Sequence, residues 1–333
     1  MDVEAFIAEW HNDSPYVLVH TSGSTGQPKP MLVEKRRMAA SARMTCDFLG
    51  LREGDTALLC MSLDYIAGKM MVVRAMERGL KLLTVEPSGH PLNIKHLTLN
   101  INHCPLDFAA MVPLQVYNSL QVPEERRRLM AIRHLLIGGG AIDDELAATL
   151  KDFPHAVWST YGMTETLSHI ALRRLNGPEA SDWYTPMAGV TLSQTDDGCL
   201  IIDAPKVHEG VLVTNDIVEM EGQPQGVRFR VLGRKDNTIC SGGVKIQAEK
   251  VELRLRAHLR EPYLISKCPD AKFGEVVVLL TTSADIEGVK AVCHEVLPKF
   301  WQPRRYVSVD HIPMTATGKP ARKEAERLIP NNP

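Results

Sequence analysis

Short apolar runs alternate along the chain with longer segments in which apolar residues recur every three or four positions. The short runs predict strands, and the longer segments predict helices between them. The predicted strands are 16–20, 56–61, 80–85, 108–112, 134–137 and 157–160, and the predicted helices are 34–49, 67–78, 113–120 and 143–151. Strands that alternate with helices are typical of a largely parallel sheet. We therefore predict a large N-terminal α/β domain whose first strand is buried.

A different pattern begins after residue 175. Asp196-Asp197-Gly198 separates two apolar runs, which is a strong hairpin signal, and further short strands follow. From residue 235 on, strands alternate with the amphipathic segments 247–259 and 286–297, which is enough for a small α+β unit. We therefore expect a domain at 1–233 with a β-rich part at about 186–233, and a small mobile α+β domain at 234–333.

Composition excludes several classes of protein. The 38 Lys and Arg nearly balance the 40 Asp and Glu, so we expect no nucleic-acid binding through phosphate contacts. The seven cysteines include no C-x-x-C pair, which argues against a disulfide framework or zinc site and favours a reducing, cytoplasmic compartment. The longest apolar stretch, 57–73, is interrupted by Asp64 and Lys69, so no membrane insertion is expected.

A loop rich in glycine and hydroxyl residues directly follows the first predicted strand. Glycines let a backbone approach a ligand closely, hydroxyl and amide groups donate hydrogen bonds, and a lysine adds charge, so the loop suits a polyphosphate. It is not a Walker loop, because that motif requires glycine where this chain has Pro28. The candidate residues are Thr21, Ser22, Gly23, Ser24, Thr25, Gly26 and Lys29.

Two later motifs also carry groups suited to a nucleotide. The segment 159–166 contains Tyr161, whose ring can stack on a purine, and Thr164, whose hydroxyl can meet a phosphate. Its Glu165 can hold a hard cation through oxygen. Asp216, in Thr214-Asn215-Asp216, could accept hydrogen bonds from ribose hydroxyls.

The remaining two motifs lie in or beside the small domain. Segments 233–237 and 241–246 fall where the two predicted domains meet, so their glycines could serve as a hinge and as a contact surface. The segment 313–319 ends in Lys319, which follows a glycine and is therefore free to reach another domain.

In this order and at these separations, the motifs resemble those of the adenylate-forming superfamily of acyl-CoA synthetases, adenylation domains and luciferases. The superfamily motifs read T-S-G-T-T-G-x-P-K-G, Y-G-x-T-E, T-G-D, G-R-x-D-D with a following G-G, and T-x-x-G-K. Gly138-Gly139-Gly140-Ala141 is similar to the adenine-binding glycine segment of the family, and 268–275 is similar to its C-terminal domain. The resemblance covers about residues 16–328.

The resemblance implies a two-step reaction that uses ATP, Mg²⁺ and coenzyme A. The carboxylate of a small-molecule acid attacks the α-phosphate of ATP to give an acyl-adenylate and pyrophosphate. A thiol, usually of coenzyme A, then displaces AMP and forms a thioester. Such a protein must neutralise charge at the α-phosphorus and hold the acid oxygen in line.

The resemblance also implies a role for each motif residue. Lys319 would contact the carboxylate and the α-phosphate, Thr164 the α-phosphate, and Glu165 the Mg²⁺ ion. The further ATP-binding residues would be Gly138, Gly139, Gly140, Tyr161, Gly162, Asp216 and Arg234, with the last two on the ribose. Asp236 aligns with the family's hinge, and Gly242 and Gly243 would line the thiol tunnel.

The chain departs from the family pattern in three places. Pro30 stands where the phosphate loop normally ends in glycine, and Asn215-Asp216 replaces the Gly-Asp pair. Only about 20 residues precede Thr21, where family members carry a long region that packs beside the sheet. We expect a naturally shortened chain or an exposed apolar face, and such a face would favour a homodimer.

Two segments resemble o-succinylbenzoate–CoA ligases of menaquinone biosynthesis, namely 62–75 and 161–170. Within the first, Arg74 interrupts an apolar helical run, so it lies on the exposed side or is half-buried and needs an anion. Because o-succinylbenzoate is a dicarboxylate, we assign its non-reacting carboxylate to Arg74, assisted by Ser168 or His169. Tyr65 and Gly68 would bound the aryl pocket.

Three other interpretations remain open. The acid could be another aryl or fatty acid, or the chain could be an adenylation domain that loads a carrier protein. From a different class, it could be a non-catalytic remnant that binds nucleotide or a partner. The presence of Lys319, Glu165 and Asp216 together argues against the remnant.

Overall fold

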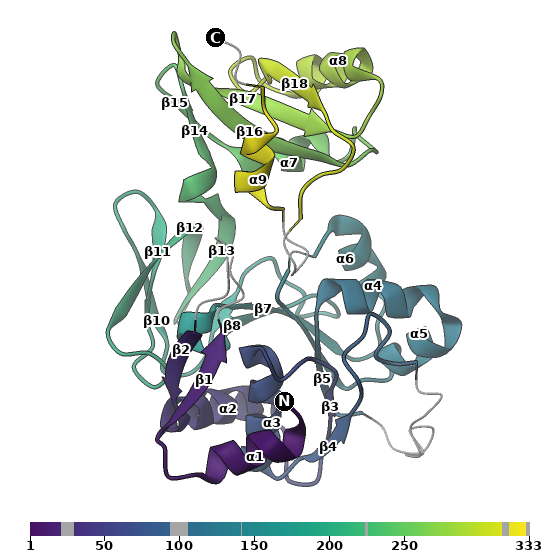
Figure 1. Cartoon of the computed structure of the whole chain (residues 1–333), viewed down its shortest axis with the longest axis vertical. Coiled ribbons are helices and arrows are strands. Elements are labelled where there is room, and N and C mark those ends of the chain that lie inside the picture. The colour runs from purple at the N-terminus through teal and green to yellow at the C-terminus, as the bar shows by residue number, and fades with distance from the viewer. Residues whose placement is uncertain (21–29, 94–105, 141, 224–225, 315–319, 331–333) are drawn as a thin grey trace. The chain divides into compact units, whose positions relative to one another are not determined.

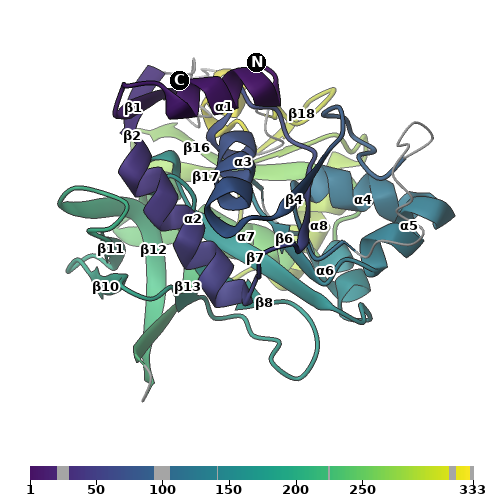
Figure 2. The same cartoon turned by 90° about the horizontal axis from the view of Figure 1, so that it is seen from below.

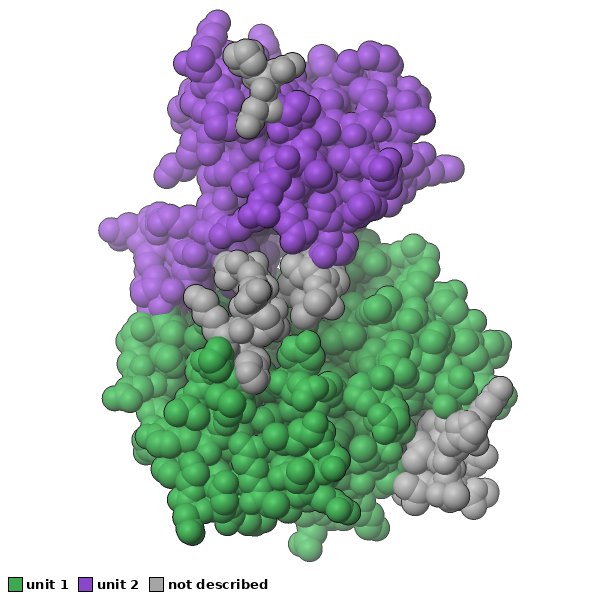
Figure 3. Space-filling model, viewed as in Figure 1, with its two compact units in different colours: residues 1–192, 202–212, 221–229 green, residues 193–201, 213–220, 230–333 purple. Residues whose placement is uncertain are grey.

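The computed structural model describes residues 1–20, 30–93, 106–140, 142–223, 226–314 and 320–330. The chain forms two compact units, coloured separately in Figure 3. The first comprises 1–192, 202–212 and 221–229, and the second comprises 193–201, 213–220 and 230–333. The domain boundary at 233/234 and the mobility of the small domain stay predictions.

The main sheet of the first unit has seven strands in the order β4-β3-β5-β6-β7-β8-β9. The first five in this order run parallel, and β8 and β9 are added antiparallel. The α/β fold with a largely parallel sheet is therefore confirmed. The strands are β3 (Thr56–Leu59), β4 (Lys81–Thr84), β5 (Phe108–Met111), β6 (His134–Ile137), β7 (Ala156–Gly162), β8 (His169–Arg174) and β9 (Thr185–Pro186).

Three helices, α4 (Pro113–Gln121), α5 (Pro123–Met130) and α6 (Asp144–Leu150), pack on one face of this sheet (Figure 1). Every second residue of the strands packs against these helices in one buried cluster, because successive side chains of a strand point to opposite faces of the sheet. Its members include Leu58, Ala109, Met111, Leu135, Ile137, Val116, Leu129, Leu146 and Leu150.

Two long helices, α2 (Lys35–Leu49) and α3 (Ile66–Arg78), lie side by side (Figure 2). Each ends at a glycine with a left-handed backbone, Gly50 at φ 64° and Gly79 at φ 66°, which is a frequent helix stop. Ion pairs between Arg43 and Glu77 and between Asp47 and Arg78 join the two helices.

The first strand differs from its prediction. β1 (Tyr16–His20) follows α1 (Val3–His11) and pairs antiparallel with β2 (Pro30–Glu34) in a separate two-stranded sheet. Val17 and Val19 are buried, but Leu18 is 43% exposed and Leu32 is 65% exposed. The expectation of a buried strand is wrong, because a strand that packs on one side buries only every second residue. The homodimer stays a prediction.

The β-rich part forms a four-stranded sheet of β10 (Thr191–Gln194), β11 (Cys199–Asp203), β12 (Val211–Gln223) and β13 (Gly226–Arg234). The predicted hairpin is confirmed: Gly198 has a φ of 83° in the turn between β10 and β11. β12 has 13 residues, so the expectation of only short strands is wrong. The division between the two units passes through this sheet.

The second unit contains a five-stranded sheet in the order β15-β14-β17-β16, with β18 paired to β17. Val277 and Leu279 of β17 face a core shared with two helices, whereas Val278 and Leu280 face a core that includes Ala325. Both faces are therefore covered, as expected of an α+β unit. The elements are β14 (Thr238–Ser241), β15 (Val244–Gln247), α7 (Ala248–Leu255), β16 (Tyr263–Asp270), β17 (Gly274–Thr281), α8 (Ile286–Val296), β18 (Arg305–Ser308) and α9 (Arg322–Arg327).

Within the described ranges, none of the helices combines the length and the apolar character that crossing a membrane would need.

Candidate active site

Most of two predicted motifs lies outside the described residues. These parts are the loop from Thr21 to Lys29 and residues 315–319 of the segment that ends in Lys319. The neighbouring residues are described: His20 pairs with Pro30 across β1 and β2, and Met314 pairs with Pro320 in an isolated bridge.

The glycine segment follows β6. Gly138 donates its amide hydrogen to the carbonyl of Met111 at 3.1 Å, and a Cβ atom on Gly138 would lie 2.3 Å from Oγ1 of Thr160. Gly139 has a φ of 78°, which favours glycine. Packing against β7 therefore explains the requirement for glycine at 138, and backbone conformation explains it at 139. Gly140 is also described, whereas Ala141 is not.

Tyr161, the predicted adenine-stacking residue, belongs to an aromatic cluster at the end of β7. Its ring centroid is 4.9 Å from that of Phe229 in an edge-on arrangement and 5.9 Å from that of Tyr184. The hydroxyl of Tyr184 lies 2.8 Å from Oγ of Ser159. Because Phe229 is fully buried, it provides a fixed support for the half-buried Tyr161 ring.

A tight turn follows Tyr161. A Cβ atom on Gly162 would lie 2.3 Å from the carbonyl oxygen of Ser168, so glycine allows this close backbone approach. The turn continues into a short 3₁₀ helix, Thr164–Thr166. The hydroxyl of the buried Thr166 closes it, since it accepts from the Met163 amide at 3.0 Å.

Two of the three residues predicted to act in catalysis lie on this 3₁₀ helix, with Thr164 half-buried and Glu165 exposed, and the third is Lys319. Among the described residues, no cation pairs with the Glu165 carboxylate, and no three His, Cys, Asp or Glu side chains are grouped to hold a metal ion. Mg²⁺ is commonly bound by one or two carboxylates together with substrate phosphates. The single exposed carboxylate therefore fits an ion that arrives with ATP.

Arg74, Ser168 and His169 come together although 94 residues separate the first two in sequence. The Nη2 group of Arg74 on α3 donates to Oγ of Ser168 at 2.6 Å, and that oxygen lies 3.3 Å from Nδ1 of His169. Arg74 is 2% exposed and His169 8%. The expectation of an exposed or half-buried Arg74 is wrong, because the side chain is buried.

The buried Arg74 guanidinium has no carboxylate partner among the described residues, and its Nε atom makes no hydrogen bond there. Burial lowers the pKa of Arg74 to about 10, so the group remains charged at neutral pH. A buried charge that lacks a counterion is costly, and a bound anion would relieve that cost. Burial and the nearby Arg74 charge hold the pKa of His169 well below its ordinary 6.5, so the imidazole is neutral.

The two residues assigned to the aryl pocket lie at the start of α3. Tyr65 precedes the helix and is 45% exposed. A Cβ atom on Gly68 would lie 2.3 Å from the carbonyl oxygen of Ser62, which gives this glycine a packing reason. Their part in a pocket stays a prediction.

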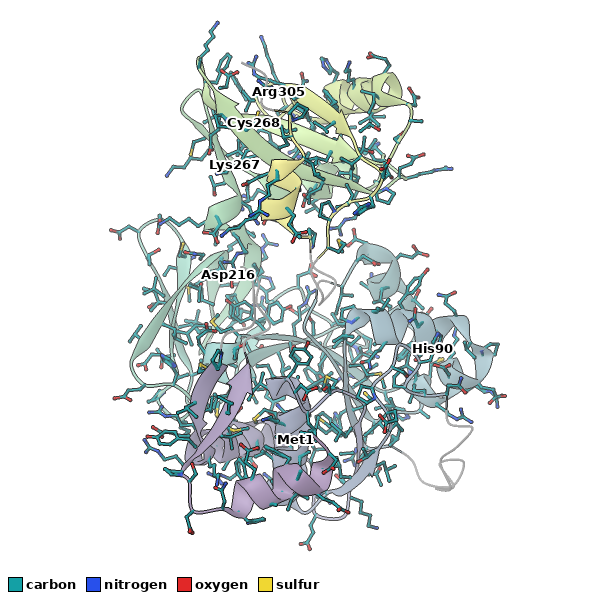
Figure 4. The ribbon with its side chains drawn as sticks, in the orientation of Figure 1. Met1, His90, Asp216, Lys267, Cys268 and Arg305 are labelled. Atoms are coloured by element: carbon teal, nitrogen blue, oxygen red, sulfur yellow. The ribbon has the colours of Figure 1, made fainter. Side chains whose placement is uncertain are left out.

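The second unit brings together the predicted ribose and hinge residues. Arg234 donates from Nη1 to Asp216 at 3.0 Å and from Nη2 to Asp236 at 2.9 Å. Asp216, labelled in Figure 4, lies on β12 with its carboxylate only 14% exposed. Gly242 and Gly243 have φ values of 57° and 84° and form the turn between β14 and β15. Both left-handed positions suit a two-residue hairpin turn, which explains the glycine pair.

Sequence reasoning missed Thr45, Phe229 and Tyr184. Thr45 on α2 is fully buried, and its Oγ1 atom lies 3.0 Å from Nε2 of His169. The signal that could have identified Thr45 was its position as a polar residue on the apolar face of a predicted helix. Phe229 and Tyr184 meet through a bridge between distant segments, which no local pattern reveals.

Known proteins of similar sequence identify the family of the chain. The family model of AMP-binding enzymes matches residues 4–210. The 2-succinylbenzoate–CoA ligase of Bacillus mycoides is 25% identical over 358 residues, an alignment that covers 98% of this chain and 73% of that protein. The corresponding ligase of a Geobacillus strain is 26% identical, with 97% and 71% covered.

The chain also resembles solved structures of AMP-forming ligases. The acyl-CoA synthetase (AMP-forming)/AMP-acid ligase II-like protein of Dyadobacter fermentans is 34% identical, with a TM-score of 0.66, and the match covers 98% of this chain and 93% of that one. The o-succinylbenzoate CoA synthetase of Bacillus subtilis, solved with an acyl-adenylate, shares the fold at a TM-score of 0.74 and 23% identity, with 93% and 68% covered. The chain therefore belongs to the AMP-binding enzyme family of AMP-forming acyl-CoA ligases.

Proposed function

We propose that this protein joins o-succinylbenzoate to coenzyme A through an acyl-adenylate. In the first step, a carboxylate oxygen bonds to the α-phosphorus of ATP, and pyrophosphate leaves with the electron pair. In the second step, the coenzyme A sulfur bonds to the acyl carbon, AMP leaves, and the thiol proton is released. The family supports the chemistry, and the names of the relatives support the acid.

The choice of acid rests on one observation, which is that the Arg74 guanidinium is buried. An acid with one carboxylate has no group left for Arg74 once that carboxylate reacts. A dicarboxylate such as o-succinylbenzoate retains a negative charge, and charge-assisted hydrogen bonds to arginine are strong in a buried site. The Nε–H of Arg74 and its Nη1 group, whose described contact is Met71 Sδ at 3.7 Å, are the donors proposed for this carboxylate.

The other site residues follow the roles that the resemblance implies. Tyr161, supported by Phe229, would stack on the adenine, and the Asp216–Arg234 pair would bind the ribose. Glu165 would hold Mg²⁺ together with the ATP phosphates. Lys319 would neutralise charge on the reacting carboxylate and the α-phosphate.

A pyrophosphate-release assay across a panel of acids, with and without coenzyme A, tests the proposal. The panel holds o-succinylbenzoate, its two analogues that each lack one carboxylate, benzoate and a fatty acid. We expect the highest kcat/KM with o-succinylbenzoate, and formation of its thioester only when coenzyme A is present. Equal activity with the fatty acid would favour another acyl-CoA ligase. Adenylation without transfer to coenzyme A would favour the loading of a carrier protein, and no acid-dependent release would favour a non-catalytic remnant.

A further inference from the structure

A chain of hydrogen bonds connects α3, the start of β8 and α2. It begins at Arg74, whose Nη2 group lies 2.6 Å from Ser168 Oγ. A guanidinium has donors and no acceptor, so Ser168 must accept this hydrogen bond. The Ser168 hydroxyl proton is then directed elsewhere, and Nδ1 of His169 lies 3.3 Å away.

The series of hydrogen bonds ends at a backbone carbonyl group. Nε2 of His169 lies 3.0 Å from Thr45 Oγ1, and Thr45 Oγ1 lies 3.2 Å from the carbonyl oxygen of Ser41. A carbonyl oxygen only accepts, so the Thr45 proton points to Ser41. Thr45 Oγ1 then accepts from His169 Nε2–H, which leaves Nδ1 free to accept from Ser168. The Arg74 end and the Ser41 end of this hydrogen-bond series therefore favour the same donor and acceptor roles for His169.

We propose that Thr45 is a positioning residue that fixes the Nε2–H tautomer of His169 and thereby keeps Ser168 in place as an acceptor for Arg74. The inference rests on the proposed function, in which Arg74 binds the second carboxylate of the acid. Because His169 is neutral, Arg74 carries the one positive charge of this group, and in this tautomer the Ser168 oxygen stays available to hold the Arg74 side chain. The Arg74 donors named above are then held ready for a carboxylate, so that little ordering is needed on binding.

The opposite tautomer would disturb this arrangement. A proton on Nδ1 would make Ser168 Oγ face two donors, one from His169 and one from Arg74, and its own proton would lose the Nδ1 acceptor. Nε2 would need a donor, which Thr45 could supply only if it released the Ser41 carbonyl. Because His169 and Thr45 are buried, water does not compensate for these losses at low cost.

A helical threonine often bonds to the carbonyl four residues earlier without any further role. Thr149 on α6 does so, since its Oγ1 donates to Glu145 O at 3.0 Å. Thr45 differs because its oxygen also meets His169. Thr149→Val is therefore the control for loss of a helical hydroxyl by itself.

The first experiment compares Thr45→Val, Thr45→Ser and Thr149→Val in the full-length enzyme. We expect Thr45→Val to raise the KM for o-succinylbenzoate about tenfold, with the KM for ATP unchanged. Thr45→Ser retains the hydroxyl and should restore the KM to within about twofold, and Thr149→Val should have no effect. With the analogue that lacks the non-reacting carboxylate, Thr45→Val should no longer raise the KM. An unchanged KM for o-succinylbenzoate, or an equal rise with that analogue, would overturn the inference.

The second experiment is ¹⁵N NMR of the histidine-labelled wild-type enzyme, with the His169 signals assigned by comparison with His169→Gln. We expect a neutral imidazole with the proton on Nε2, and Nδ1–H would overturn the inference even if Thr45→Val does not fold. Because this measurement needs no substrate, it is separate from the pyrophosphate assay. A wild-type enzyme inactive on every acid would contradict the proposed function, whereas the tautomer would still decide the role of Thr45.

Discussion

Phe229 stands edge-on to Tyr161, with the two ring planes at 81° and the ring centroids 4.9 Å apart. The residue on β13 thereby fixes the orientation of the ring proposed to stack on adenine. Edge-to-face aromatic pairs contribute about 0.5–1.5 kcal/mol beyond the burial of their area. The pair links the β-rich sheet to the end of β7 within the first unit.

Phe229→Leu should therefore weaken ATP binding without affecting the acid. Leucine keeps much of the apolar volume but loses the edge contact, so we expect the KM for ATP to rise about two- to tenfold. Steady-state kinetics with each substrate varied would measure this effect. Phe48→Leu is the matched control, because Phe48 makes a similar edge-on pair with Trp158 at 5.2 Å. A larger change in the KM for the acid than for ATP would contradict the assignment.

Arg74→Ala should raise the KM for o-succinylbenzoate strongly and leave ATP binding intact. Loss of a hydrogen bond to a charged group costs about 1.5–3 kcal/mol, which corresponds to roughly 10- to 150-fold in KM. Initial rates of pyrophosphate release would give both constants. Arg74→Lys keeps the charge without the planar fork, so an intermediate KM is expected. Unchanged kinetics in Arg74→Ala would remove Arg74 from the acid site.

Lys319→Ala should separate the two steps of the reaction. The side chain is proposed to neutralise charge only while the adenylate forms, so the variant should lose pyrophosphate release. Thioester formation from a supplied acyl-adenylate and coenzyme A should persist. Single-turnover measurements of each step would test this, and full adenylation by the variant would refute the role of Lys319.

Gly162→Ala should destabilise the protein as well as reduce its activity. The added Cβ atom would lie 2.3 Å from the Ser168 carbonyl oxygen and 2.6 Å from Cα of His169, so the backbone must shift. Such overpacking typically costs about 1–3 kcal/mol of unfolding free energy. Gly222→Ala is the control, because among the described residues, its two chain neighbours aside, no heavy atom lies within 4 Å of a Cβ atom there. Thermal unfolding would compare the two, and equal midpoints would argue against the tight turn.

Stability should fall as the pH is lowered below the ordinary histidine pKa of 6.5. Burial is the main reason that the pKa of His169 lies well below this value in the folded state, whereas unfolded His169 takes up a proton. The unfolded state then binds more protons, so acid favours unfolding by up to about 1.4 kcal/mol per pH unit for this histidine. His134, whose pKa burial lowers to about 4, acts in the same direction.

Urea unfolding of the wild type and of His169→Gln between pH 5 and about 8 would measure this effect. Since glutamine does not titrate, the variant should show a smaller loss of stability on acidification. Equal pH dependence in the two proteins would show that His169 is accessible to protons in the folded state.

The pattern of apolar runs and helix stops was enough to predict the α/β fold, because these are local properties of the chain. The order and spacing of the motifs were enough to predict the family. Helix ends at Gly50 and Gly79 and the turn at Gly198 follow directly from residues with a left-handed preference. The pairing of β1 with β2 did not follow from the sequence, because the pattern of a strand specifies neither the strand that pairs with it nor which of its two faces is covered.

The sequence singled out Arg74 as a charge that needs an anion, but only the tertiary structure decided that it is buried and that Ser168 accepts its hydrogen bond. Only the tertiary structure revealed that Thr45 contacts His169 and that Phe229 contacts Tyr161, because each pair joins segments far apart in the chain. Local propensities determine which elements form. Packing of α2 and α3 beside β8 determines which of their polar side chains meet, since a buried polar group must find its partners in whatever element lies opposite.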